Sequence, residues 1–515
     1  MDNNSKKDLG QMTFQEKLDE IRKISEENRK LRERITENAR TAESLRERRR
    51  RMKDEQLHFV KSSEEDCYQD PDEWYEDEEK DFDDSGADDF GQPPAEDKPD
   101  IEAQGRAAEE FRSGRLIAAR DAAYPLDDIA SKRNNNVLVV GAAGTGKTRH
   151  FVTPNILEAV GSMFVCDPKG QLCKQYGRYF EGKGYKVRQI DFVHPERSDG
   201  YNPMDYIRNT HDITKLAAVI VDAKESEGTN ADPYWDRMTE TLISSLIGYL
   251  IETRSKDKDF HGILDLLLKS ESYDPDSYNK NSELKEMFER HKRLNPRSWA
   301  AEKFCQAYAA PQKTYDTIRT TLSAKFCELD TEEIRQMMHR GGFDFRRVAQ
   351  EKTVVFVTVS DTDRSMDSLV NIFFSQAMNE LCSYADDECP EGRLPIPVRF
   401  FLDDFATNCR IEEFPRMISS IRSRGLSTIL MLQAEAQLRS CYGHDAQTII
   451  SNCDTYIYLG GSDIDTAGNI AERCDCPLAD VLYMPVGECR IFRRGERPVI
   501  SRLVEVDKLI KDLDK

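Results

Sequence analysis

The chain has 515 residues and a formal net charge of −21 at pH 7, which excludes a uniformly basic nucleic-acid-binding protein. Residues 64–100 hold eighteen acidic residues against two lysines, so this stretch carries −16 and the other 478 residues sum to −5. A basic surface elsewhere in the chain is therefore compatible with the acidic total. Thirteen scattered cysteines predict a reducing cytoplasm, and the absence of 18 consecutive apolar residues or a signal-peptide core predicts neither a membrane span nor secretion.

The N-terminal part predicts two segments. Within residues 1–62, apolar residues recur every seven positions between Phe14 and Met52, with Asn28 and Asn38 on the same seam. This spacing is typical of a coiled coil that pairs with itself or with a partner helix, and a single solvated helix is the alternative because the seam is short. Residues 63–105, rich in acids and prolines, predict a disordered linker.

After the linker, apolar runs alternate with helical patterns, which predicts an α/β fold with a mostly parallel sheet covered by helices. The expected strands are residues 137–140, 162–166, 186–190, 353–359, 398–402, 428–432 and 455–459. Between residues 190 and 353 the patterns are helical. We therefore expect a nucleotide-binding domain in two parts, residues 106–207 and 345–515, with an all-α domain inserted at residues 208–344.

The first expected strand runs into a glycine-rich loop that matches a nucleotide-phosphate cradle. The candidate ligand-binding residues are Gly141, Ala142, Ala143, Gly144, Thr145, Gly146, Lys147 and Thr148. Backbone N–H groups of such a loop surround the β-phosphate, the lysine reaches the β- and γ-oxygens, and the threonine hydroxyl ligates Mg²⁺. A chance glycine-rich turn is the alternative. The pattern predicts a nucleoside triphosphate with Mg²⁺ as the cofactors.

A phosphate loop needs an acid from a neighbouring strand, and Asp403 and Asp404 follow the apolar run at residues 398–402. We expect Asp403 to hold the metal with Thr148, and Asp404 to polarise the attacking water. An ordinary acidic pair at the end of a strand is the alternative interpretation.

Three further polar residues belong to the candidate catalytic set. Gln433 follows the strand expected at residues 428–432 and is predicted to sense the γ-phosphate, whereas capping of the next turn is the alternative. Arg422 and Arg424 precede that strand, and one of them is predicted to reach the γ-phosphate of a neighbouring subunit. Solvated surface arginines are the alternative here.

Asp167-Pro-Lys-Gly170 matches an element of GTP switch proteins, but the chain lacks the Asn-Lys-x-Asp element that would select guanine. The sequence therefore favours ATP over GTP.

Several motifs together resemble the TraG/TraD-type coupling proteins of conjugation and type IV secretion. In chain order they are residues 134–148, 166–170, 201–204, 232–235, 401–406, 421–424, 432–433 and 452–454. The resemblance covers about residues 134–502. It implies a RecA-like P-loop NTPase domain with an all-α insertion, assembled as a homohexameric ring that uses ATP to move DNA.

The partners implied by the resemblance are DNA bound without sequence preference, relaxase or relaxosome proteins, and components of the type IV secretion channel. Such proteins commonly carry N-terminal transmembrane helices, in whose place this chain has the heptad segment. We therefore expect a cytoplasmic protein held at the membrane by a separate anchor protein. The family usually has Asp-Glu where this chain has Asp403-Asp404, and because the second side chain is shorter, the sequence supports ATP binding more strongly than hydrolysis.

The sequence leaves three functional hypotheses. The first is an ATP-driven motor that transfers DNA, or a relaxase–DNA complex, to a secretion channel. The second is a non-hydrolysing, ATP-binding adaptor of the transfer apparatus, and the third is a segregation or packaging translocase of the same superfamily.

Overall fold

The computed structural model describes residues 100–222, 233–269, 283–360, 362–405, 410–411 and 413–513. The predicted coiled coil and most of the predicted linker lie outside these ranges. The linker prediction was too long at its C-terminal end, because helix α2 (Ile101–Ser113) begins inside it. The carboxylate of Asp100 accepts a hydrogen bond from the Ala103 N–H at 3.0 Å and caps this helix, which buries Ala107 and Phe111.

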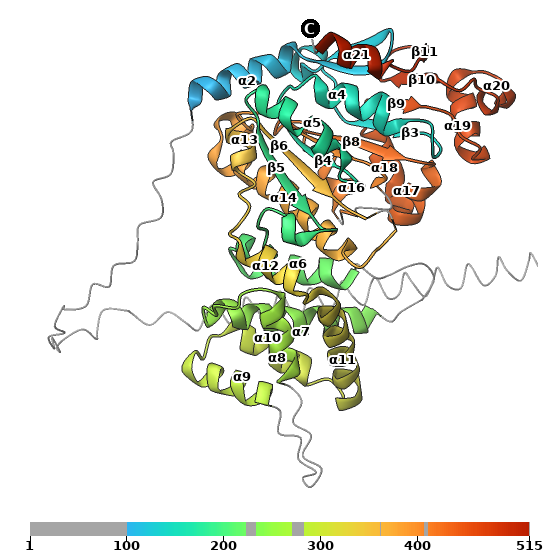
Figure 1. The fold of residues 1–515 in the computed structure, drawn as a ribbon. Coiled ribbons are helices and arrows are strands. Elements are labelled where there is room, and N and C mark those ends of the chain that lie inside the picture. Colours follow the sequence, from blue (N-terminus) through green and yellow to red (C-terminus); the bar gives the residue numbers. More distant parts are fainter. Residues whose placement is uncertain are drawn as a thin grey trace, which may run out of the picture. The chain divides into compact units, whose positions relative to one another are not determined.

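The described residues form a nine-stranded sheet and a separate two-stranded sheet (Figure 1). The order in the large sheet is β11-β10-β9-β3-β8-β7-β4-β6-β5, and every pairing from β9 to β5 is parallel. These strands are β3 (Val137–Val140), β4 (Ser162–Cys166), β5 (Lys186–Asp191), β6 (Thr353–Thr358), β7 (Val398–Leu402), β8 (Leu426–Leu432) and β9 (Thr455–Tyr458). The predicted α/β class and mostly parallel sheet are confirmed.

Four strands escaped prediction. They are the hairpin β1 (Arg115–Ala119) and β2 (Ala122–Pro125), and the antiparallel edge strands β10 (Glu488–Arg493) and β11 (Val499–Arg502). Each is partly exposed, and polar residues interrupt the apolar pattern of β10 and β11. Strand β1 does contain the short apolar run Leu116–Ala119, which the sequence interpretation did not assign.

Helices cover both faces of the large sheet, and alternate residues of β3 point to opposite faces. Val137 and Val139 pack in one cluster with Phe111, Ile156 and Phe180. That face is covered by α2, α4 (Thr153–Leu157) and α5 (Gln171–Gly182). The other residues of β3 pack in a second cluster with α14 (Asp367–Glu388), α18 (Ala446–Ser451) and α19 (Ile464–Cys474). Burial on both faces explains the apolar character of most of these strands, whereas the edge strand β5 exposes Lys186 and Arg188.

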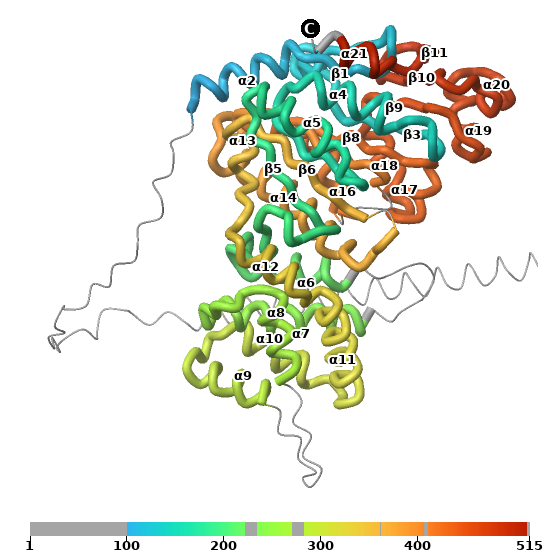
Figure 2. The backbone as a smooth tube through the Cα atoms, in the orientation of Figure 1, coloured from blue at the N-terminus to red at the C-terminus, as the bar shows by residue number. Residues whose placement is uncertain are grey.

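Between β5 and β6 the described residues contain no strand, only loops, short 3₁₀ turns and α-helices. These α-helices are α6 (Thr210–Asp222), α7 (Pro233–Glu252), α8 (Phe260–Leu268), α9 (Glu283–Leu294), α10 (Trp299–Tyr308), α11 (Gln312–Leu329), α12 (Glu332–His339) and α13 (Arg347–Gln350). Their buried side chains continue the second cluster, and the backbone path can be followed in Figure 2. No helix in the described part of the chain is long and apolar enough to cross a membrane.

The remaining α-helices among the described residues are α3 (Asp128–Ser131), which precedes β3, and four helices that follow β7. These four are α16 (Phe414–Met417), α17 (Glu435–Tyr442), α20 (Leu478–Leu482) and α21 (Val506–Leu513). All five lie outside the segment between β5 and β6.

Asn136, just before β3, forms hydrogen bonds that link the amino ends of the neighbouring strands β3, β8 and β9. Its buried side-chain oxygen accepts hydrogen bonds from the N–H and the hydroxyl of Thr428 in β8, at 3.1 and 3.3 Å. Its amide nitrogen donates to the carbonyl oxygens of Asn452 and Ile418, at 3.1 and 3.3 Å. Asn134 adds a link, since its backbone N–H donates to Asp454 at 2.6 Å. The asparagine-rich segment before the loop therefore has a structural role.

We predict that Asn136→Ala lowers the free energy of unfolding by roughly 2–3 kcal/mol, because it leaves buried groups of three strands unpaired. The measurement is the thermal midpoint of the full-length protein. Asn295→Ala is the matched control, since the exposed side chain of Asn295 has no described hydrogen bond. Equal midpoints for the two variants would contradict the assigned role.

Candidate functional site

The glycine-rich loop lies between β3 and a helical turn at Lys147–Val152, and its shape requires glycine at defined positions. Gly144 and Gly146 have φ angles of +81° and +83°, a region that other L-residues rarely adopt. A Cβ atom on Gly146 would also lie 2.3 Å from Cδ2 of His150. A Cβ atom on Gly141 would lie 2.7 Å from the Thr145 hydroxyl. The loop backbone is therefore closely packed.

Lys147 is buried inside this loop. Its ammonium group donates to the carbonyl oxygen of Gly141 at 2.7 Å and approaches that of Ala142 at 3.5 Å. The lysine charge thus lies within the curve of the loop.

Thr148 brings the loop into contact with the predicted acid. Its hydroxyl donates to Oδ2 of Asp403 at 2.6 Å, although the two residues are 255 positions apart. Burial raises the pKa of the Asp403 carboxyl above its ordinary value, while donation from Thr148 and the charge of Lys147 act in the opposite direction. A buried carboxylate beside a hydroxyl is an oxygen-donor pair of the kind that Mg²⁺ prefers.

The acid does not come from the strand next to β3, as the sequence interpretation assumed. Strand β8 lies between β3 and β7 in the sheet. Asp403 still reaches Thr148 because the three strands are parallel and end at the same edge. The neighbouring strand instead supplies Gln433.

Asp404 and Gln433 are brought together at this edge. The Gln433 side-chain amide donates to Oδ1 of Asp404 at 3.4 Å. Asp404 has a φ of +47°, and its N–H donates to Oδ1 of Asp403 at 3.1 Å. The turn after Gln433 is capped by another residue, because the Gln437 side chain accepts the Gln433 N–H at 2.7 Å. The side chain of Gln433 therefore faces the acidic pair.

Arg422 and Arg424 lie away from this edge. They precede β8, whose seven residues span roughly 20 Å to the end that carries Gln433. Arg422 donates to the carbonyl oxygen of Asp128 at 2.6 Å, and Arg424 makes a two-point ion pair with Asp386 at 2.8 and 2.7 Å. Neither arginine contacts the loop of its own chain.

Asp167, in the motif that resembles a GTP switch element, caps α5. Its buried carboxylate accepts hydrogen bonds from the N–H groups of Gln171, Leu172 and Cys173 at 3.1, 2.7 and 3.1 Å. Gly170 makes the turn with a φ of +59°. The oxygens of Asp167 are occupied by the helix, which accounts for this motif without a nucleotide.

A cavity of about 420 Å³ adjoins the loop, and sequence reasoning missed it. Its lining comes from distant segments, namely Arg120, His150, residues 485–488 and residues 502–505. His150 joins it to the loop, since the ring packs against Gly146 and Nδ1 lies 2.8 Å from the Val504 carbonyl oxygen. Val486 lines the cavity with a fully exposed apolar side chain. Only the tertiary structure brings these segments together.

Among the described residues, no three His, Cys, Asp or Glu side chains gather as a metal-binding cluster. The side-chain oxygens of Thr148 and Asp403, which contact each other, are the candidate metal donors.

The chain matches one protein family in sequence and several solved structures in fold. Residues 101–475 match the family model described as type IV secretory system conjugative DNA transfer. No curated protein sequence matches the chain.

Among the solved structures that share the fold are three of conjugative coupling proteins. The bacterial conjugative coupling protein TrwBdeltaN70 with sulphate is 18% identical, with a TM-score of 0.58, 78% of this chain covered and 92% of the other. The plasmid coupling protein TrwB with ADP and Mg²⁺ is 18% identical, with a TM-score of 0.57 and coverages of 78% and 91%. TrwB with the ATP analogue ADPNP is 17% identical, with a TM-score of 0.55 and coverages of 79% and 92%.

Proposed function

This chain belongs to the type IV secretory system conjugative DNA transfer family, and on that premise we propose that it is an ATP-dependent coupling protein that moves DNA to the secretion channel. The third hypothesis, a segregation or packaging translocase, is not favoured because the matching family is one of conjugative transfer.

The observation that carries the proposal is the 2.6 Å contact between Thr148 and Asp403. It joins a phosphate loop to a carboxylate from another strand, which is the arrangement that holds a nucleotide–Mg²⁺ complex. Thr148 and Asp403 would hold the metal, which supplies neutralising charge to the phosphates when bound. TrwB has been solved with ADP and Mg²⁺ and with ADPNP, which supports this choice of ligand.

Lys147 would bind the phosphates. Its ammonium donates to loop carbonyl oxygens, and phosphate oxygens are stronger acceptors because they are charged. Residues 141–146 would supply backbone N–H donors to the same phosphates.

The 420 Å³ cavity beside His150 would receive the base and ribose. It lies within the size range of small-ligand pockets and directly adjoins the loop. The exposed side chain of Val486 offers an apolar surface for the flat face of a base.

Hydrolysis requires a group that orients water near the γ-phosphate. Asp404 and Gln433 are the candidates, because both lie at the edge of the sheet that carries the loop and contact each other. Asp404 would act as general base and Gln433 as γ-phosphate sensor. The alternative, a non-hydrolysing adaptor, is motivated by the short side chain of Asp404, which is held toward Gln433.

We further propose assembly into a homohexameric ring. Arg422 and Arg424 lie at the opposite edge of the sheet from the phosphate loop, so an arginine of one subunit could serve only the site of another. To reach that site, the arginine would first have to break its contact within its own chain, with Asp128 for Arg422 or with Asp386 for Arg424. Relaxase or relaxosome proteins are the proposed cargo, DNA is bound without sequence preference, and a separate protein would anchor the ring to the membrane.

Lys147→Ala is expected to weaken ATP binding by roughly 10–100-fold and to abolish DNA-stimulated ATPase activity, because a charge-assisted contact to the phosphates is lost. The assay compares no DNA, single-stranded DNA and double-stranded DNA, together with a sizing measurement. Lys174→Ala, which removes an exposed lysine of α5, is the matched control. Undiminished ATPase activity of Lys147→Ala would exclude the assigned site.

Asp404→Asn is expected to lower ATPase turnover at least 100-fold while changing ATP affinity less than about threefold, since a general base acts mainly in the transition state. Turnover and affinity are measured on the same preparation. The adaptor hypothesis expects a different result, namely no turnover in the unaltered protein and a gain of turnover in Asp404→Glu.

Val486→Ser is expected to weaken ATP binding about fivefold to tenfold without affecting tripolyphosphate, which has no base. Tyr483→Ser is the control, because Tyr483 is also an exposed apolar residue nearby but does not line the cavity. An equal loss for both ligands in Val486→Ser would place the base elsewhere.

A further inference from the structure

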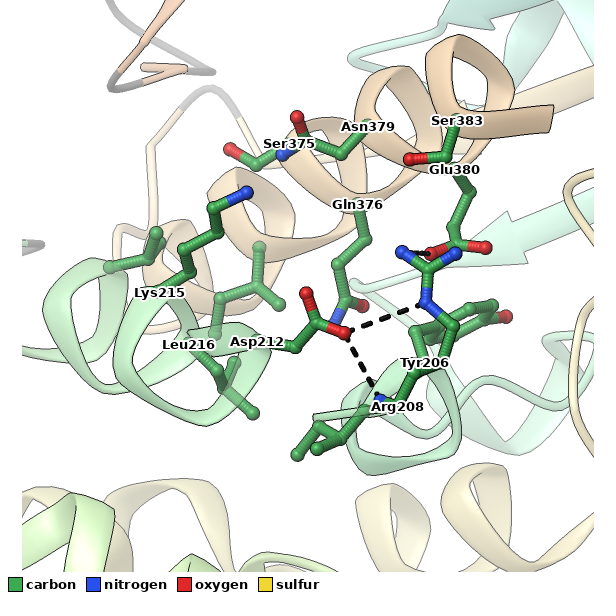
Figure 3. Close-up of a pocket in the computed structure, with 13 residues that line it drawn as sticks. Tyr206, Arg208, Asp212, Lys215, Leu216, Ser375, Gln376, Asn379, Glu380 and Ser383 are labelled. Carbon is green, nitrogen blue, oxygen red and sulfur yellow. Dashed lines mark hydrogen bonds and ion pairs between the residues drawn. The ribbon is translucent and has the colours of Figure 1, made fainter. Parts of the chain in front are cut away.

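A second cavity, of about 90 Å³, lies between α6 and α14 (Figure 3). None of its lining residues belongs to the candidate nucleotide site. It is separate in sequence from the phosphate loop, and the family role assigns nothing to it. The chemistry of this cavity is therefore independent of the proposed nucleotide site.

In one half of this cavity, the charged and amide side chains have partners within the chain. The Arg208 guanidinium lies 3.0 Å from Glu380 and 3.5 Å from Asp212, and the Asp212 carboxylate also accepts the Arg208 N–H at 3.1 Å. Gln376 accepts the Tyr201 hydroxyl at 2.6 Å and donates to a backbone carbonyl at 2.8 Å. Figure 3 shows the ion pairs together on this side. Each of these groups is therefore already held by a partner within the chain.

The other half is unpaired within the described chain. Ser375 is 8% exposed, and its buried hydroxyl has no hydrogen-bond partner among the described residues. Asn379 of α14 and the exposed Lys215 of α6 line the same space, and neither side chain has a described hydrogen bond or ion pair. In Figure 3 the polar ends of these three side chains lie on the same side of the cavity, away from Arg208.

The side chains of Lys215, Ser375 and Asn379 determine which class of ligand this cavity can bind. An unpaired buried hydroxyl costs roughly 1–3 kcal/mol, so an apolar ligand would leave Ser375 unsatisfied. A cation would be repelled by Lys215, because both carboxylates of the cavity already contact Arg208. An oxyanion can accept hydrogen bonds from the ammonium, the hydroxyl and the amide together.

The volume limits the size of the ligand. At about 10–15 Å³ for each water-sized position, the cavity holds roughly six to nine such positions. This is room for a phosphate ion with some of its water, but not for a nucleotide or a peptide.

We propose that this cavity is a binding site for a phosphate-sized tetrahedral oxyanion, held by Lys215, Ser375 and Asn379. Lys215 lies on α6, which packs on both α7 and α14, whereas Ser375 and Asn379 lie on α14 against the sheet. A bound oxyanion therefore joins the first helix of the inserted helical part to a helix of the sheet domain and stabilises their contact.

The test titrates inorganic phosphate into the full-length protein by calorimetry, in a Lys147→Ala background that removes the phosphate loop's lysine. We expect one bound phosphate. Adding Lys215→Met or Ser375→Ala weakens this binding at least tenfold, whereas Lys256→Met, which removes an exposed lysine outside the cavity, leaves it unchanged.

Ser375→Ala separates binding from folding. Because its hydroxyl has no partner among the described residues, its removal does not lower the thermal midpoint without phosphate, and relief of the unpaired hydroxyl raises that midpoint. The further increase that phosphate causes in the Lys147→Ala protein is lost in this variant. The proposal is overturned if the Lys147→Ala protein binds no phosphate in the millimolar range, which would make this a water-filled cavity only. It is also overturned if acetate binds as tightly, or if the Lys215 and Ser375 variants bind like the control.

Discussion

The site depends on one constraint, that strands β3, β8 and β7 run parallel and end at the same edge of the sheet. This shared direction brings Thr148, after β3, to within 2.6 Å of Asp403, after β7. It also places Gln433, after β8, beside Asp404. If one of the three strands ran in the opposite direction, its polar residues would lie at the far edge and the site would not form. Asn136 stabilises this arrangement from the other edge.

The same constraint divides the polar residues into two groups. Residues that follow strands lie near the phosphate loop, and residues that precede strands lie roughly a strand length away. Arg422 and Arg424 belong to the second group and are engaged with Asp128 and Asp386. A role for Arg422 or Arg424 at the nucleotide site would therefore need a neighbouring subunit, which connects this part of the proposed catalysis to the proposed ring.

The two cavities differ in how their polar groups are arranged. The cavity beside His150 adjoins the loop and has an exposed apolar wall at Val486, which suits the flat base of a nucleotide. The cavity between α6 and α14 is smaller and contains the hydroxyl of Ser375, which has no partner among the described residues. Because the two linings differ, the two cavities suit different ligands. The oxyanion proposed for the cavity between α6 and α14 would bind without occupying the nucleotide site.

Local pattern in the sequence determined much of this protein. The seven parallel strands, the glycine-rich loop and the polar residues that end β7 and β8 were all predictable, because burial on both faces leaves apolar runs in most of these strands and tight turns require glycine. The partly exposed strands β10 and β11 left no such run, and the short run in β1 was not recognised as a strand.

Only the tertiary structure decided the order of the strands, which puts β8 between β3 and β7, and the composition of the two cavities. It also decided that Asp167 caps a helix and that the arginines before β8 face intrachain carboxylates. These features depend on contacts between segments up to several hundred residues apart. Periodicity and turn chemistry act over a few residues, so they contain no information about which distant segments meet.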